Sequence, residues 1–111
     1  MIYKMKLYSD SFEKIKFGSK TIEMRLNDEK RKAIKIGDFI EFTNNTTNEK
    51  ILCEVVKLYK YKDFEELYKH HSKIAIGYLK DDNNDPKDML SYYSKEDIKK
   101  YGVLGIEIKL L

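Results

Sequence analysis

The sequence predicts an α+β fold: a curved, mostly antiparallel sheet or small β-barrel with short helices packed beside it. Segments with strand-like alternation outnumber helical segments, and hairpin-length loops join most of them. A chain of 111 residues is also long enough to bury one sizeable core. No stretch has the composition of a linker, so we predict a single domain over residues 1–111.

The first predicted elements are a strand and a short helix. Residues 1–8 read as a strand. Asp10 is followed three residues later by Glu13, a spacing typical of a capping box at a helix start. Gly18 is well placed to end that helix.

The stretch GSKTIEMRL, residues 18–26, alternates with a period of two, as a strand does. The alternation predicts a buried apolar face. Opposite it, the alternation predicts a polar face on which the side chains of Glu23 and Arg25 are exposed. The apolar face carries Ile22, Met24 and Leu26, and the polar face carries Thr21, Glu23 and Arg25.

The middle of the chain predicts an exposed turn, two strands and a helix. The charged segment 28–38 suits an exposed turn or short helix and ends at a Gly-Asp pair. Segments 38–42 and 50–61 read as antiparallel strands joined by a polar loop. Asp63, with Glu66 three residues later, predicts the start of a helix over 64–71.

The last third predicts a loop, a helix and a closing strand. Residues 80–88 are polar and contain the only proline, so we expect a mobile loop. Ser94 is placed to cap a helix through residue 101. The chain then closes on a largely buried strand, whose alternating apolar residues are Leu104, Ile106, Ile108 and Leu110.

Composition excludes some classes of protein and leaves others open. The net charge of +3 does not by itself indicate a nucleic-acid binder. Cys53 is the only cysteine and lies in an apolar run, so we expect a buried, unreactive thiol. We expect no membrane segment and no signal peptide, and therefore a cytoplasmic protein.

Arginine is scarce among the cations. Only Arg25 and Arg31 are arginines among 22 lysines and arginines. Against such a background a retained arginine suggests a site that needs a planar, bidentate donor.

Polar residues concentrate on the strand over residues 18–26. Lys20, Thr21, Glu23 and Arg25 fall within six residues. One interpretation is a solvated strand face with an ion pair. The other is a polar notch beside Gly18, where a helix ends next to the strand, and such notches bind ligands.

Two pairs of adjacent side chains are further candidates for site residues, one of tyrosines and one of histidines. Tyr92 and Tyr93 follow the predicted mobile loop, and exposed tyrosine rings can stack on unpaired bases. We expect one of the two rings to be buried and one to be available. His70 and His71 have no Cys, or His at four-residue spacing, to complete a metal site, so we predict no metal and no cofactor.

Three segments of the sequence resemble the ASCH domains of the PUA-like superfamily. GSKTIEMR matches the signature GxKxxExR, IKIGDFIEF resembles the family's "GD.I.F" strand, and YGVLGIEI resembles its closing strand. The resemblance implies a small PUA-like β-barrel with flanking helices. It also implies a cleft for a nucleotide or an RNA segment, lined by Gly18, Lys20, Glu23 and Arg25.

The resemblance leaves binding and catalysis open. One branch of the family hydrolyses N4-acetylcytidine with a lysine of this motif, a threonine three residues later and a downstream carboxylate. Lys20 matches the lysine, but Glu23 occupies the threonine position, which favours binding. We therefore predict an RNA- or nucleotide-binding domain. The alternatives are a hydrolase using Lys20 and Glu23, as an amidohydrolase on a modified nucleoside or a ribonuclease, and an interaction domain for another protein.

Overall fold

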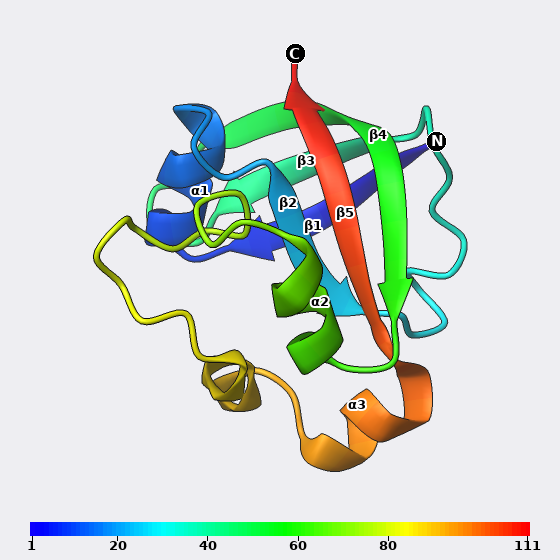
Figure 1. Cartoon of the computed structure of the whole chain (residues 1–111). Helices are drawn as coiled ribbons and strands as arrows, with labels where there is room; N and C mark the ends of the chain where they lie inside the picture. Colours follow the sequence, from blue (N-terminus) through cyan, green and yellow to red (C-terminus); the bar gives the residue numbers. More distant parts are fainter.

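The computed structural model describes residues 1–111 and has the predicted α+β fold (Figure 1). Five strands form one sheet, and short helices pack against both of its faces. The elements in chain order are β1 (Ile2–Leu7), α1 (Ser9–Lys16), β2 (Ile22–Leu26), β3 (Phe39–Asn44), β4 (Lys50–Tyr61), α2 (Phe64–His70), the 3-10 helix η1 (Pro86–Ser91), α3 (Lys95–Tyr101) and β5 (Val103–Leu110).

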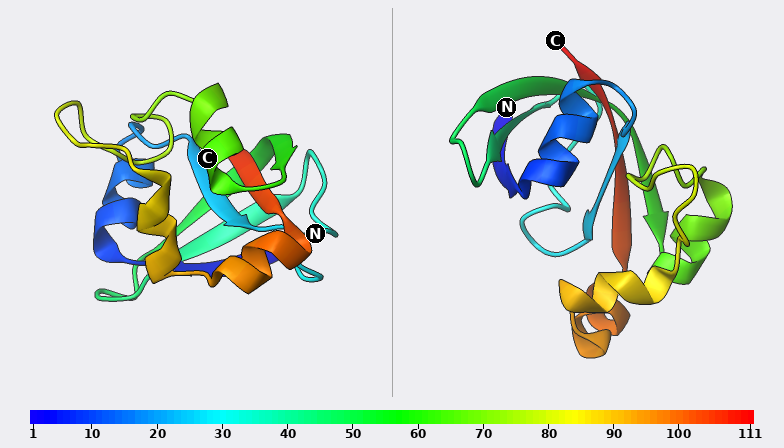
Figure 2. Two further views of the ribbon diagram at one scale, coloured as in Figure 1. Left: turned by 60° about the horizontal axis from the view of Figure 1, so that its bottom comes forward. Right: turned by 90° about the vertical axis from the view of Figure 1, so that its left-hand side faces the viewer.

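The sheet is a half-barrel whose strands lie in the order β1-β3-β4-β5-β2. Only β1 and β3 are parallel, so the expectation of a mostly antiparallel sheet is confirmed. The strands curve around α1, as the right-hand view of Figure 2 shows. A side chain of β2 also joins the two edge strands, because Arg25 Nη2 donates to the Lys6 carbonyl of β1 at 3.0 Å.

Each face of the sheet has its own apolar cluster. The inner cluster lies between the curved strands and α1 and includes Phe12, Phe42 and Ile106. The outer cluster lies between β2, β5 and α2 and includes Met24, Leu67 and Met89 of η1. Apolar burial on both faces is the main force that holds these short elements together.

The closing strand is buried on both faces along much of its length, which simple alternation does not predict. Val103 packs in the outer cluster and Leu104 in the inner one, and Gly105 is also buried. The expectation that Leu110 is buried is wrong, because it lies at the strand's far end and its side chain is 40% exposed.

Two of the three predicted helix caps are present in the structure. The Asp63 side chain accepts a hydrogen bond from the Glu66 amide, and Ser94 accepts one from Asp97, so both caps are confirmed. At α1 the capping box is wrong: the helix begins at Ser9 without a side-chain cap, and Asp10 instead pairs with Lys14 one turn on. No helix is long and apolar enough to cross a bilayer.

Candidate functional site

The register of β2 directs two charged side chains to the inner face of the sheet. Glu23 lies opposite Ile106 of β5, and Arg25 lies opposite Leu104. Directly paired strand residues share a face, and both partners belong to the inner cluster. The polar side of β2 therefore faces the concavity of the half-barrel rather than bulk solvent.

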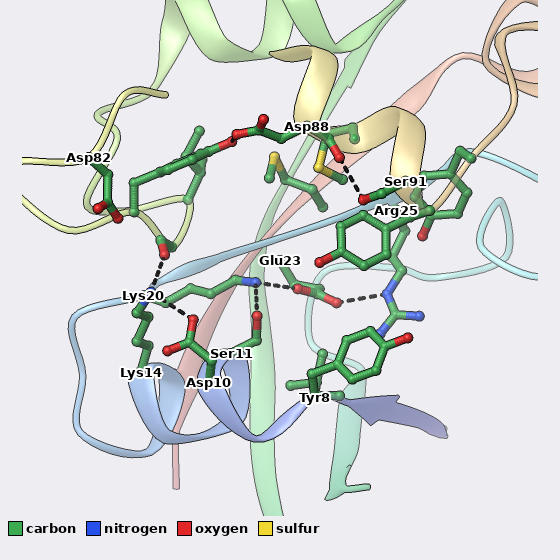
Figure 3. A pocket seen from close by; sticks show the side chains of 18 of the residues that line it. Tyr8, Asp10, Ser11, Lys14, Lys20, Glu23, Arg25, Asp82, Asp88 and Ser91 are labelled. Atoms are coloured by element: carbon green, nitrogen blue, oxygen red, sulfur yellow. Dashed lines mark hydrogen bonds and ion pairs between the residues drawn. The ribbon is translucent and has the colours of Figure 1, made fainter. Parts of the chain in front are cut away.

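Lys20, Glu23 and Arg25 form one continuous ion network (Figure 3). Lys20 Nζ lies 2.8 Å from Glu23 Oε1, and Arg25 Nε lies 2.7 Å from Glu23 Oε2. Each carboxylate oxygen thus has its own cation, which is an arrangement that compensates a buried charge well.

The expectation that Glu23 is open is wrong. Glu23 is only 4% exposed and Lys20 only 6%, while Arg25 is partly exposed. The reason is the curvature of the sheet, which brings α1 over the inner face and places Ser11 Oγ 3.5 Å from Lys20 Nζ. Local alternation predicts which residues share a face, but it cannot predict that a helix covers it.

The network fixes the protonation states of its members. Burial by itself raises the pKa of Glu23, but the Lys20 ammonium and the Arg25 guanidinium outweigh burial and hold this pKa below its ordinary value. Burial by itself lowers the pKa of Arg25, but the Glu23 carboxylate more than offsets it and raises that pKa. Glu23 is therefore an anion at neutral pH and a poor general base.

The network lines a pocket of about 780 Å³. Tyr8 and Tyr92 line the same pocket and are 65% and 58% exposed, and their ring centroids are 6.1 Å apart. Tyr8 and Arg25 both line this pocket (Figure 3). Tyr93 also lines the pocket but is partly buried and stacks on Phe64.

A second wall of the pocket consists of hydroxyl and carboxylate groups. Tyr78 donates to Asp88 Oδ2 at 2.8 Å, and its hydroxyl lies 2.7 Å from that of Tyr68. Burial, followed by these hydrogen bonds, raises the pKa of Tyr78, so this phenol stays protonated at neutral pH. The pocket thus presents cations near Arg25 and neutral or anionic acceptors on this wall.

Arg25 retains hydrogen-bonding capacity for a ligand. Its guanidinium has five N–H donors, of which one is bound by Glu23 and one by the Lys6 carbonyl. The Tyr93 hydroxyl is a further hydrogen-bond partner of the guanidinium, and the donors that remain can meet a ligand. No group of three or more His, Cys, Asp or Glu side chains is placed to hold a metal ion.

Two residues of the sequence motif do not line the pocket. Thr21 is exposed and precedes β2, so the expectation that it shares the site with Glu23 is wrong. Its backbone explains this position, because the Thr21 amide donates to the Ala75 carbonyl. Gly18 is also exposed and lies outside the pocket, where its φ of +91° ends α1.

Several pocket residues were not predicted from the sequence. Tyr8, Ser11, Tyr78 and Asp88 all line the pocket. They come from the turn before α1, from α1, from the segment after α2 and from η1. No local pattern marks them, since only the packing of these distant elements brings them together.

Comparison with known proteins places the chain among related folds. The ASCH domain model matches residues 5–111. No curated protein matches the chain. The crystal structure of the hypothetical protein PH0355 is 33% identical, with a TM-score of 0.87 and 100% of both chains covered. The solution structure of protein PF0455 from Pyrococcus furiosus is 32% identical, with a TM-score of 0.75, covering 100% of this chain and 98% of that one.

A third similar structure shares the fold at low identity. A mutant of ZmASCH from Zymomonas mobilis is 13% identical, with a TM-score of 0.63, covering 97% of this chain and 67% of that one. The family model covers residues 5–111, and the two structures above 30% identity cover the whole chain. The chain therefore belongs to the ASCH domain family, a PUA-like family associated with RNA.

Proposed function

We propose that this domain binds one nucleotide unit of a single-stranded RNA in the pocket lined by Arg25, Tyr8 and Tyr92. The observation that carries the proposal is the pairing of two exposed tyrosine rings with an arginine that has unused donors. An unstacked base offers both of its faces to aromatic rings, and stacking contributes about 1–3 kcal/mol per base. The guanidinium can meanwhile donate two parallel hydrogen bonds to a base edge or to phosphate.

The ion network supports binding more than it supports hydrolysis. Glu23 is held as an anion between two cations, so its role is to orient Arg25 rather than to accept a proton. A preorganised arginine loses less conformational freedom when it binds. The pocket volume of about 780 Å³ lies within the range of small-molecule and cofactor sites.

Hydrolysis of a modified nucleoside or of an RNA linkage is the second candidate function. The observation in its favour is the Ser11 hydroxyl, which lies 3.5 Å from Lys20 Nζ on the pocket wall. A serine nucleophile needs a base that removes its proton. Lys20 Nζ is already engaged as the ion-pair partner of Glu23 at 2.8 Å, so the structure offers no free base beside Ser11.

Mononucleotide titrations test the proposal, with the two arginines as a matched pair. The four ribonucleoside 5′-monophosphates are titrated while amide shifts are followed by NMR. Arg25→Ala should weaken binding of the preferred nucleotide by about 1–3 kcal/mol, or roughly 5- to 150-fold. Arg31→Ala is the control, because Arg31 pairs with Asp28 and does not line the pocket.

Two results would contradict the proposal. One is equal affinity of wild type, Arg25→Ala and Tyr92→Ser for every nucleotide, which would exclude this pocket as the site. Tyr92→Ser matters here because Tyr92 is exposed, so its loss leaves the ion network intact. The other is turnover of N4-acetylcytidine or cleavage of an RNA oligonucleotide that Ser11→Ala abolishes, which would favour the hydrolase.

A further inference from the structure

A second pocket lies beside the first and is rich in lysine. Its volume is about 640 Å³, and it lies among the N-terminal end of α2, the helix η1 and α3. Figure 2 shows η1 and α3 following one another along this side of the molecule. We call it the lysine pocket, and the lysines that line it are Lys62, Lys87, Lys95 and Lys99.

None of these four lysines forms an ion pair within the protein. Five other lysines do form ion pairs, among them Lys14 with Asp10 and Lys16 with Glu49, whereas fifteen of the 20 lysines, these four included, form none. The lysine pocket does contain Asp63 and Glu65, but Asp63 already accepts from the Glu66 amide as the cap of α2. With four lysines and two carboxylates among its lining residues, the pocket carries an excess of positive charge, which an external anion would complement.

Lys95 is placed against the local preferences of a helix, whereas Lys99 lies in the last turn of α3, where the helix dipole favours a cation. They are four residues apart on α3 and both line the pocket, and like charges at that spacing destabilise a helix. Lys95 is also the first residue of α3, where the helix dipole disfavours a cation. Residues that break local rules in this way commonly serve function rather than stability.

The lysine pocket adjoins the pocket lined by Arg25, Tyr8 and Tyr92, which we call the nucleotide pocket. Lys87 of η1 lines both of them. The other η1 residues divide between the two sides: Asp88, Met89 and Ser91 line the nucleotide pocket, whereas Pro86 and Leu90 line the lysine pocket. The helix η1 is thus a narrow ridge between two adjoining hollows.

We propose that the lysine pocket binds the phosphodiester backbone of an RNA strand whose base occupies the nucleotide pocket. This inference rests on the proposed function and extends it from one nucleotide to a strand that crosses η1. Lysine ammonium groups bind phosphate as point charges, without reading the base, so this contact adds affinity without sequence preference.

The experiment compares oligonucleotide binding with mononucleotide binding in the same variants. The probe is a fluorescein-labelled RNA octamer of randomised sequence, measured by anisotropy between 50 and 200 mM salt. The test variant is Lys95→Gln/Lys99→Gln, which removes two charges and keeps good helix formers. The control is Lys35→Gln/Lys109→Gln, since both lysines are exposed, unpaired and outside both pockets.

We expect the test variant to lose part of its salt dependence. Each phosphate contact contributes about −0.7 to the slope of log K against log salt, so the slope should become shallower by roughly 1.4. Across a four-fold rise in salt, wild type should then lose about seven-fold more affinity than the test variant. The control variant should keep the wild-type slope, and both variants should bind mononucleotides as wild type does.

The inference and the proposed function fail in different ways. If mononucleotides bind in an Arg25-dependent manner but the octamer slope is the same in all three proteins, the lysine pocket does not bind the backbone. The proposed function would stand in that case. If an acidic peptide such as octaglutamate binds as tightly as the octamer and depends on the same lysines, the pocket is a general polyanion site, and the inference is overturned.

Discussion

Glu23 is the residue on which the geometry of the site depends. Its two carboxylate oxygens separate Lys20 from Arg25, and both cations would otherwise face each other across a buried space. Taking a carboxylate out of water is costly, but two close cations recover much of that cost. The main effect of the network is therefore to fix the orientation of the Arg25 guanidinium.

The stability of the protein should depend on pH through Glu23. Its folded-state pKa lies below the ordinary value of 4.5, so the carboxylate stabilises the fold fully above that value. The contribution is lost as the pH falls through the lower, folded-state pKa. Glu23→Gln should cost about 3 kcal/mol at pH 7, because it removes the charged partner of the buried Lys20 and of the partly exposed Arg25.

Urea unfolding of wild type and Glu23→Gln between pH 7 and pH 3 measures this difference. The gap between the two proteins should be widest at neutral pH and should shrink in acid. Glu41→Gln is the control, since Glu41 lies on β3 and has no ion pair. A gap that stays constant down to pH 3 would mean that the carboxylate charge does not stabilise the fold.

At the scale of elements, the segment that follows α2 holds Lys20 in place. The Ala75 carbonyl accepts from the backbone amides of Thr21 and Ile22, and the Gly77 carbonyl accepts from Lys14 Nζ of α1 at 2.7 Å. Gly77 also lies against the Lys20 side chain, where an added Cβ would lie 3.1 Å from Lys20 Cδ. This segment therefore links α1, β2 and the ion network.

Substitution of Gly77 should disturb both stability and binding. Its φ is +110°, so Gly77→Ala introduces backbone strain of about 1–3 kcal/mol, and the new methyl group also crowds Lys20. Gly37→Ala is a closely matched control, because its φ is +93° and nothing lies within 4 Å of the added Cβ. Chemical denaturation should show both variants destabilised, with Gly77→Ala the worse.

Mononucleotide affinity separates the two variants more sharply. Gly77→Ala should weaken binding because displacement of Lys20 loosens Glu23 and, through it, Arg25. Gly37→Ala should bind nucleotides as wild type does, since Gly37 lies in the turn before β3 and does not line the pocket. Equal affinities for the two variants would show that the position of Lys20 has no effect on the ligand.

Local elements were easier to predict from the sequence than the site. The caps at Asp63 and Ser94 and the buried face of β2 follow from interactions within a few residues, which a sequence displays directly. The burial of Glu23 could not be predicted in this way, because α1 covers it only after the sheet has curved. The same reason explains why Ser11 and Tyr78 were missed.

At the scale of the whole molecule, two clusters share one sheet. The inner cluster is closed by α1, and the outer cluster is closed by α2 and η1, so β5 is covered on both faces along most of its length. The edge strands β1 and β2 are joined by the bond from Arg25 to the Lys6 carbonyl. The pocket, which residues of both β1 and β2 line, therefore lies at the open edge of the half-barrel.

The rate at which the single cysteine is labelled can measure how often the sheet opens. Cys53 lies on β4 in the inner cluster with no exposed surface, and burial raises its pKa to about 11. At pH 8 only about one folded-state thiol in a thousand would be ionised, and the closed structure leaves no thiol surface for a reagent to reach. Labelling of Cys53 by a thiol reagent should therefore require opening of the sheet that β4 helps to build.

Comparison of two free energies tests whether this opening is global. Labelling rates in 0 to 2 M urea, divided by the rate of the unfolded chain, give the free energy of exposing Cys53. Circular dichroism in urea gives the free energy of unfolding of the whole domain. We expect the two values and their urea slopes to agree, because β4 pairs with β3 and β5 along most of its length and its inner side chains pack in one cluster with α1. A labelling free energy lower by more than about 1 kcal/mol, with a shallow urea slope, would show that β4 opens locally while the rest of the sheet stays folded.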